Sequence, residues 1–177
     1  MGMAPVEPTV PVEEYLATEY DPDCDYVDGE LLERNFGERD HGELQGHIYA
    51  HFVNLRMQLR VYPFIEQRVQ VSRTRYRVPD ICLVLGARPN EQIFTQPPFV
   101  AIEVLSPEDR VSRMQQKIDD YLSFGIRYVW LIDPQTRRAW VHTPDGVREA
   151  KDGILKTEDP ELTLPLPEIF QAIDSME

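Results

Sequence analysis

The chain lacks any apolar run long enough to cross a membrane, and it has almost no cysteine. No stretch of its 177 residues approaches the roughly 20 apolar residues that a membrane-spanning helix needs. Residues 1–14 have neither the basic start nor the apolar centre of a secretory signal. Cys24 and Cys82 are the only cysteines, and their wide separation matches no clustered metal motif. We therefore expect a cytoplasmic protein that has two reduced thiols and no membrane partner.

Positive charge is absent from the start of the chain. Residues 1–33 carry ten acidic residues and no Lys or Arg, and the whole chain has a net charge of −13. Between Arg56 and Arg77, by contrast, six arginines accompany a single acid, Glu66. The net charge argues against a generic nucleic-acid binder, whose affinity depends on neutralising phosphates. The net charge nevertheless conceals an acidic start of the chain and a basic middle. Any single arginine of this middle segment is more commonly a solvated surface residue than a ligand-binding one.

The order of the predicted elements indicates a single α/β domain. Apolar spacing of three and four predicts a helix from Asp40 to about Arg60, with Asp40 and Glu43 as a capping box. Strand-like runs follow at residues 64–71, 76–85, 99–105 and 127–132, of which the first two are expected to pair antiparallel. We expect a mixed β-sheet flanked by helices.

The ends of the last long helix and of the domain are also predicted. Ser106 as N-cap, with Pro107 at the first helical position, predicts a helix that starts there and ends at Gly125. Residues 1–25 are expected to be a flexible acidic lead, and residues 26–177 are expected to form the folded domain.

Two carboxylates interrupt strands that are otherwise apolar. Asp80 lies within the run 76–85 and Glu103 within the run 99–105. A carboxylate in a buried strand is costly unless it is paired, protonated or bound to a cation. Either acid alone is more simply a solvated or Arg-paired strand end. The two together favour a site for a hard divalent ion, Mg²⁺ or Mn²⁺.

Lys117 is the third candidate residue of this site. At 100° per residue it lies on the flank of the apolar stripe of its helix, whereas a fully exposed lysine would lie opposite that stripe. Its side chain should point back toward the start of the helix, so we expect its ammonium within direct or water-mediated reach of Glu103. Taken alone, such a lysine is more often a snorkelling surface residue.

These residues belong to a longer pattern that resembles a known family. The pattern consists of Val78-Pro79-Asp80, Ile102-Glu103-Val104-Leu105-Ser106-Pro107, Arg113, Lys117, Tyr121, Gly125 and Tyr128-Val129-Trp130-Leu131-Ile132-Asp133-Pro134. It resembles the PD-(D/E)XK nuclease superfamily and, within it, the Uma family of restriction-endonuclease-like proteins. The resemblance extends over roughly residues 26–170.

The resemblance implies a restriction-endonuclease-like α/β core and metal-dependent hydrolysis of phosphodiester bonds. It assigns Asp80 and Glu103 as metal-binding acids and the backbone carbonyl of Val104 as a further ligand. The superfamily lysine normally stands two residues after the second acid, where this chain has Leu105. In this family Lys117 takes its place, so the resemblance implies that Asp80, Glu103 and Lys117 are the catalytic residues.

Other residues offer weaker candidates. Related nucleases often lend an acid from the first helix to the metal, and Glu43 is that candidate, although the capping box explains it equally well. His47 and His51 have the helical i, i+4 spacing of a metal pair, but no Glu follows His47 as a metalloprotease requires. The candidate nucleic-acid contacts are Arg73, Arg75, Arg77 and Arg113.

The sequence thus predicts a Mg²⁺- or Mn²⁺-dependent endonuclease that acts on DNA. A homodimer is expected, because cutting both strands of a duplex usually takes two active sites. Two alternatives remain open at this point. One is a non-catalytic binding or assembly module that keeps the nuclease fold, and the other is a nuclease that acts on RNA or branched nucleic acid. Fold alone cannot decide between them.

Overall fold

The structure, a computed structural model, describes residues 9–35 and 38–174. Its elements, in chain order, are α1 (Val12–Ala17), β1 (Cys24–Val27), β2 (Glu30–Glu33), α2 (Arg39–Leu59), β3 (Val61–Ile65), β4 (Val69–Ser72), β5 (Arg75–Arg77), β6 (Ile81–Leu85), β7 (Val100–Val104), α3 (Val111–Phe124), β8 (Tyr128–Asp133), β9 (Arg138–Thr143), β10 (Gly146–Glu149), β11 (Ile154–Lys156), β12 (Thr163–Pro165) and α4 (Leu166–Asp174). None of the helices in these ranges combines the length and apolar character needed to cross a membrane.

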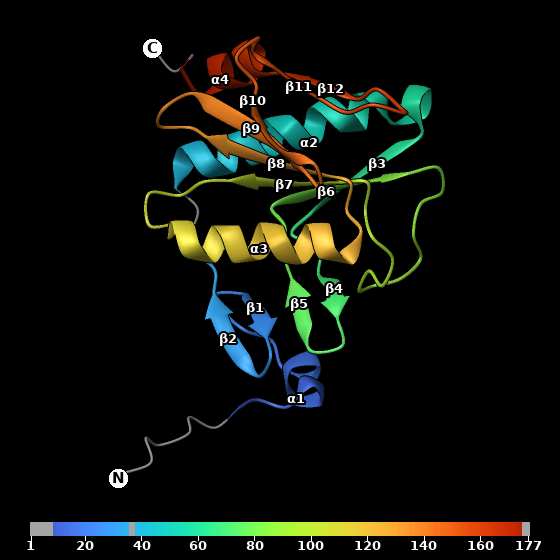
Figure 1. The fold of residues 1–177 in the computed structure, drawn as a ribbon, viewed down its shortest axis with the longest axis vertical. Helices are drawn as coiled ribbons and strands as arrows, with labels where there is room; N and C mark the ends of the chain where they lie inside the picture. Colours follow the sequence, from blue (N-terminus) through green and yellow to red (C-terminus); the bar gives the residue numbers. More distant parts are fainter. Residues whose placement is uncertain (1–8, 36–37, 175–177) are drawn as a thin grey trace.

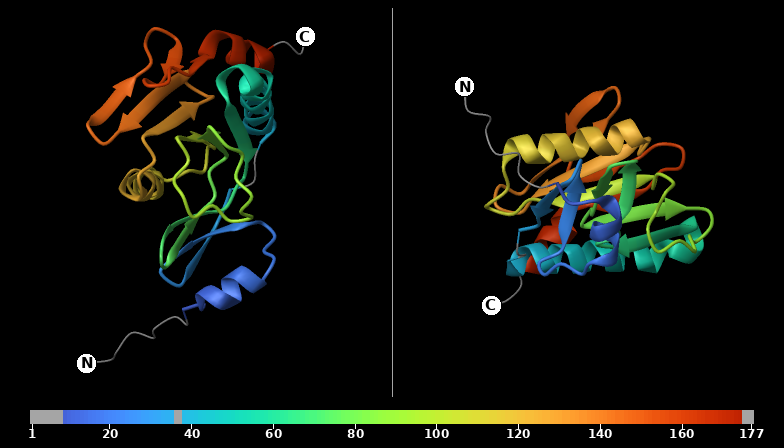
Figure 2. Two further views of the ribbon diagram at one scale, coloured as in Figure 1. Left: turned by 90° about the vertical axis from the view of Figure 1, so that its right-hand side faces the viewer. Right: turned by 90° about the horizontal axis from the view of Figure 1, so that it is seen from below.

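A six-stranded sheet, in the order β10-β9-β8-β7-β6-β3, forms the centre of the molecule. Helix α3 crosses one face of this sheet, and α2 and α4 lie on the other face (Figure 1). A four-stranded sheet, β2-β1-β5-β4, projects from the body on the side of α3 and carries α1 at its far end (Figure 2). The expected α/β class, a mixed sheet flanked by helices, is confirmed.

The larger sheet is mixed because of one crossover. Strands β7 and β8 pair parallel, whereas the other neighbours in this sheet pair antiparallel. Parallel neighbours need a long connection, and α3 supplies it. This helix ends at Gly125, whose φ of 110° is the left-handed conformation that terminates helices and that glycine adopts without strain.

Strand β7 divides its side chains between two hydrophobic cores. Successive side chains of a strand point to opposite faces. Val100, Ile102 and Val104 accordingly join the core beneath α2 and α4, whereas Ala101 joins the core beneath α3. Glu103 has the same parity as Ala101 and therefore faces α3.

The two long strands expected at 64–71 and 76–85 are each split, and that prediction is wrong in this respect. The outer halves pair as β3 with β6 in the larger sheet, and the inner halves pair as β4 with β5 in the smaller sheet. Pro79 lies at the break in one strand, where it cannot donate a ladder hydrogen bond. Glu66, with a φ of 49°, lies at the break in the other. These two breaks place the smaller sheet next to the start of β6, the strand that follows Asp80.

The predicted starts of both long helices are also wrong. Helix α2 begins at Arg39 after Glu38, and Asp40 pairs with Arg39 without capping the helix. Helix α3 begins at Val111 after Arg110. Residues 106–109 instead form a tight turn in which the Asp109 carboxylate accepts from the Ser106 amide at 2.7 Å. Local side-chain hydrogen bonds of this kind compete with helix formation.

The acidic lead is folded over the part that the structure describes. Tyr15 of α1 is fully buried against Tyr26 and Tyr76 of the smaller sheet, with the rings of Tyr15 and Tyr26 stacked at 4.8 Å. The boundary expected after residue 25 falls inside β1. Residues 1–8 of the lead lie outside the described residues.

A chain of ion pairs joins the smaller sheet to α3. Arg77, at the end of β5, contacts Asp25 of β1 at 3.1 Å and Asp120 of α3 at 2.6 Å. Arg75 contacts the same Asp120 and also Asp28 in the β1–β2 turn. The Arg77 side chain is only 2% exposed. The orientation of α3 over the site therefore depends on a buried guanidinium.

We expect Arg77→Met to lower the free energy of unfolding by about 3–5 kcal/mol, because it leaves Asp25 and Asp120 buried without their shared cation. Urea denaturation followed by circular dichroism measures this change. Arg73→Met is the matched control, since Arg73 is exposed on the same hairpin, and it should change stability by less than about 0.5 kcal/mol. Equal losses in the two variants would contradict the structural role of Arg77.

Candidate active site

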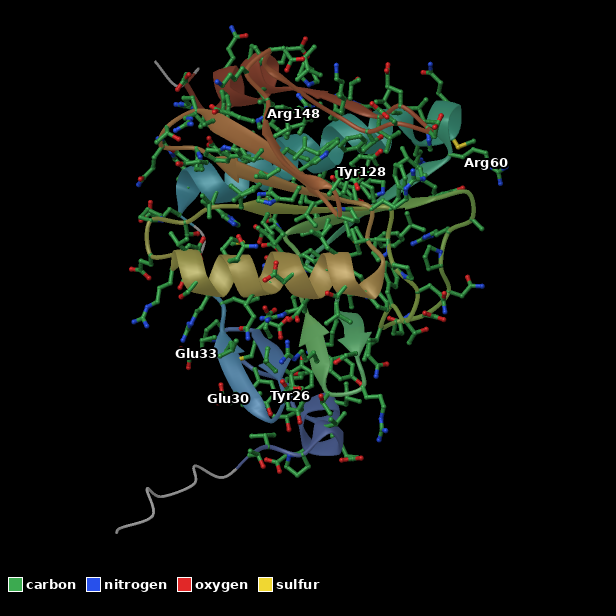
Figure 3. The ribbon with its side chains drawn as sticks, in the orientation of Figure 1. Tyr26, Glu30, Glu33, Arg60, Tyr128 and Arg148 are labelled. Carbon is green, nitrogen blue, oxygen red and sulfur yellow. The ribbon has the colours of Figure 1, made fainter. Side chains whose placement is uncertain are left out.

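A cavity of about 610 Å³ opens between the two sheets at the start of α3. Its wall is built by residues from separate parts of the chain, which lie within 21–25, 32–35, 77–80 and 103–117, together with His41, Gly42, Gln45 and Glu66. In Figure 3, Glu33 marks the edge of this cavity on β2, beneath the first half of α3. Asp80, Glu103, Val104 and Lys117 all line it. The cavity therefore brings together the two acids, the backbone position and the lysine that the sequence singled out.

Asp80 and Glu103 face each other across neighbouring strands. The last antiparallel pair between β6 and β7 joins Ile81 to Ile102. One step further in the same register places Asp80 opposite Glu103, and opposite residues have Cβ atoms about 4.5–5.5 Å apart. The Val104 amide also donates to Asp80 Oδ2 at 2.8 Å. The two carboxylates thus approach one point on the face toward α3.

Three groups stabilise the ionised form of Asp80 besides the amide of Val104. Arg34 Nη2 lies 2.8 Å from Oδ1, and His41 Nε2 lies 3.2 Å from Oδ2. Burial by itself would raise the pKa of Asp80, but the His41 hydrogen bond and the charges of Lys117 and Arg34 hold it below its usual value. Asp80 is therefore a buried, charged carboxylate.

Glu103 accepts hydrogen bonds from two side chains of α3. Tyr121 Oη donates to Oε1 at 2.6 Å, and Lys117 Nζ lies 2.9 Å from Oε1 and 3.0 Å from Oε2. Burial raises the pKa of Glu103 to about 7, and the neighbouring charge of Asp80 acts in the same direction, whereas Lys117 opposes both. Glu103 is therefore harder to ionise than Asp80, as expected for like charges that share one site.

Lys117 lies on the helix face predicted for it, and its side chain is more deeply buried than its place at the edge of the apolar stripe suggests. Its side chain is 12% exposed, and its ammonium also donates to the carbonyl of Val78 at 3.1 Å. Asp25 Oδ2 lies 3.9 Å away. Burial lowers the pKa of Lys117, but the charges of Asp25, Glu103 and Asp80 outweigh burial and raise it. The predicted direct contact with Glu103 is confirmed.

The first turns of α2 supply residues other than the one expected. His41 and Gln45 line the cavity, and Gln45 Nε2 donates to the carbonyl of Asp80 at 2.9 Å. Residues four apart share one face of a helix. Glu43 is two residues from each of them, about 200° around the helix, and it does not line the cavity. Its Oε2 is buried without a hydrogen-bond partner among the described residues.

The arginines expected to contact nucleic acid are divided by the structure. Arg75 and Arg77 are held by carboxylates, as described above, and Arg73 lies on the β4–β5 turn away from the cavity. Arg113 lines the cavity, together with Arg110. Both are exposed, and among the described residues no carboxylate pairs with either. The unpaired positive charge at the cavity therefore comes from the start of α3.

The residues that line the cavity suit a hard divalent ion better than zinc. His47 is exposed and His51 contacts the carbonyl of Thr163, so these two histidines do not form a metal pair. Across residues 9–35 and 38–174, no three His, Cys, Asp or Glu side chains are grouped as metal ligands. Mg²⁺ commonly binds through one or two carboxylates and keeps several waters. Asp80, Glu103 and the Val104 carbonyl fit such an ion.

The sequence alone gives no site role to four residues that shape this site. Arg34, His41 and Asp25 come from segments distant in the sequence from both acids, and no local spacing connects them to the acids. Tyr121 carried a usable signal, because it lies four residues after Lys117 and so shares its helix face. The same spacing relates His41 to Gln45 on α2.

The chain is similar to known proteins in sequence and in fold. Residues 12–174 match the family model Uma2, described as "Putative restriction endonuclease". Among solved structures, a putative nuclease belonging to DUF820 from Anabaena variabilis ATCC 29413 is similar, with a TM-score of 0.79 and 23% identity. The match covers 91% of this chain and 97% of that one. At this identity the likeness shows a shared fold. Among curated proteins, none matches this chain.

The pairing of His41 with Asp80 should make stability depend on pH. Burial lowers the pKa of His41, but the hydrogen bond and charge of Asp80 raise it above the usual 6.5, while Arg34 opposes and Glu103 assists. The pair therefore stabilises the fold fully below about pH 6.5, and this contribution is lost as the pH rises through the higher folded value. His41→Gln should cost about 1–2 kcal/mol at pH 6 and progressively less above pH 7.

Urea denaturation of the parent and the variant across this pH range measures the difference. His47→Gln is the control, since His47 is exposed on the same helix, and it should follow the parent throughout. A cost for His41→Gln that stays constant with pH would contradict a charged His41.

Proposed function

The chain belongs to the Uma2 family, whose members are described as putative restriction endonucleases, and on this premise we propose that it is a divalent-metal-dependent endonuclease that hydrolyses DNA. The observation that carries the proposal is the arrangement at the floor of the cavity. Asp80, directly before β6, and Glu103 of the adjacent strand β7 are both buried and line the same cavity, and the Lys117 ammonium lies 2.9 Å from Glu103. Perturbed, converging titratable groups in a cavity are typical of catalytic sites.

The proposed metal ligands are Asp80, Glu103 and the backbone carbonyl of Val104. A bound Mg²⁺ or Mn²⁺ would polarise the scissile phosphate and lower the pKa of a coordinated water. Asp80 suits this role because its carboxylate is held in the ionised form, and Glu103 lines the same cavity. Glu43 is left out of the ligand set because it lies off the cavity.

Lys117 and Tyr121 have separate roles in this proposal. The Lys117 ammonium is fixed by Glu103 and the Val78 carbonyl, so it can orient a nucleophilic water or stabilise charge that develops on the phosphate. Tyr121 donates to the other side of Glu103. It therefore holds the carboxylate in one orientation and does not itself face the cavity.

The proposed DNA contacts are Arg110 and Arg113 at the mouth of the cavity. Their unpaired guanidinium groups can bind phosphates, although the acidic residues of segment 21–25 line the same cavity. Such binding should weaken steeply with added salt, because it releases counterions. Cutting both strands of a duplex usually takes two sites, and on this ground we also propose a homodimer.

A non-catalytic module remains the second candidate, and one observation favours it. In the described residues, both carboxylates of the site already have cationic partners, Arg34 and His41 on Asp80 and Lys117 on Glu103. Acids neutralised in this way can serve structure alone. Binding of a divalent cation separates the two candidates.

Asp80→Asn should abolish Mn²⁺ binding, since it removes the ionised ligand of the pair. Isothermal titration of the parent and the variant with Mn²⁺ measures the loss. Glu108→Gln is the matched control, because Glu108 is an exposed acid on the cavity rim, and it should retain binding within about twofold of the parent. Equal binding by the parent and Asp80→Asn would place the cation elsewhere, and no binding by either would favour the non-catalytic module.

Lys117→Met should abolish cleavage of supercoiled plasmid in Mn²⁺ while Mn²⁺ binding persists. The variant should also lose about 3 kcal/mol of stability, because Glu103 and Asp25 lose a buried counter-charge. Gel electrophoresis measures nicking, and circular dichroism confirms that the variant is folded at the assay temperature. Lys151→Met, at an exposed lysine in a turn, controls for loss of charge.

Cleavage by Lys117→Met at the parent's rate would refute the assigned role of the lysine. A parent that cuts single-stranded RNA in preference to plasmid would reassign the substrate without changing the metal chemistry.

A further inference from the structure

Arg34 occupies an unusual position for an arginine in a site that is proposed to bind a cation. Its Nη2 donates to Asp80 Oδ1 at 2.8 Å, while His41 and the Val104 amide contact Oδ2. Lys117 and Tyr121 meanwhile contact Glu103. The contact between Arg34 and Asp80 therefore places a full, permanent positive charge directly against one oxygen of the Asp80 carboxylate.

A divalent ion bound by Asp80 would meet the Arg34 guanidinium, because Arg34 Nη2 already contacts one of the two carboxylate oxygens. A cation that binds between Asp80 and Glu103 approaches carboxylate oxygens on the cavity side, where Arg34 lies. Two positive charges a few ångströms apart in a partly buried site repel each other strongly. A cation at Asp80 would therefore bind more weakly while Arg34 keeps its contact with this carboxylate.

The structure offers Arg34 a second carboxylate. Glu66 Oε1 lies 3.6 Å from Arg34 Nη1, and the Glu66 side chain is 51% exposed. The Arg34 side chain is 15% exposed and lines the cavity, as does Glu66. Arg34 can therefore release Asp80 and keep a counter-ion by a rotation of its side chain. Asp80 meanwhile retains His41 and the Val104 amide.

We propose that Arg34 is a displaceable counter-ion of Asp80 that competes with the divalent cation, and that Glu66 receives it when the cation binds. This inference rests on the proposed metal site. It adds a residue that sets how tightly the metal binds. The free protein keeps its buried acid neutralised, and the affinity for metal is lower than the two acids alone would give.

The test measures Mn²⁺ affinity by isothermal titration in the parent, Arg34→Gln and Arg34→Lys. Removing a charge-assisted hydrogen bond to Asp80 should tighten Mn²⁺ binding by about tenfold in Arg34→Gln. Arg34→Lys keeps the charge and should bind with an affinity between those of the parent and Arg34→Gln. Because Asp80 keeps two other partners, we expect both variants to fold, and circular dichroism checks this.

Arg110→Gln is the matched control for general charge. Arg110 also lines the cavity, but no carboxylate pairs with it in the described part of the chain. Its removal should tighten Mn²⁺ binding by less than about twofold, because an exposed charge is screened by solvent and salt. Glu66→Gln should weaken binding in the parent and have a smaller effect in the Arg34→Gln background, since residues that act together are not additive.

The outcomes separate this inference from the function on which it rests. If Arg34→Gln binds Mn²⁺ no more tightly than Arg110→Gln while the parent binds measurably, the competition is refuted and the metal site stands. If neither the parent nor Arg34→Gln binds Mn²⁺, the metal site is refuted, and the inference with it. If only Arg34→Gln binds measurably, Arg34 excludes the cation, and the competition is supported.

Discussion

Two carboxylates buried face to face are the constraint on which the rest of this structure depends. Asp80 and Glu103 cannot remain in an apolar sheet without compensation, and their separation forbids leaving both charges bare. The fold supplies that compensation from three directions. Arg34 follows the second strand of the smaller sheet, His41 comes from the first turn of α2, and Lys117 comes from α3. Each neighbouring layer is thereby tied electrostatically to the same pair of strands.

The smaller sheet contributes charged side chains to the site. Arg77 joins Asp25 on β1 to Asp120 on α3, and Asp25 in turn lies near the Lys117 ammonium. The tyrosine cluster of Tyr15, Tyr26 and Tyr76 holds the outer face of this sheet together. Residues that look like an acidic tail in the sequence therefore form a wall of the cavity and help to fix the lysine.

Much of the site could be predicted because its signals are local. Asp80 and Glu103 stand out as acids in apolar strands, and helical periodicity places Lys117 toward the sheet. The starts of α2 and α3 could not be predicted from capping residues, because Asp40 and Asp109 bond to nearby groups in other ways. Analogy with related nucleases points to Glu43, whereas packing decides which face of the helix meets the cavity. Arg34 reaches Asp80 across 46 positions of sequence, a contact that only the folded chain reveals.

The alternation of β7 between two cores also limits how its sequence can change in length. Deleting one residue before Glu103 would exchange the two faces of the strand, sending the acid under α2 and α4 and bringing an aliphatic side chain to Lys117. Deleting two would restore the faces but move the acid two residue pairs away from Asp80. Only the present number of residues before Glu103 keeps the acid both on the face toward α3 and next to Asp80. We therefore expect β7 to tolerate substitutions but not insertions or deletions before Glu103.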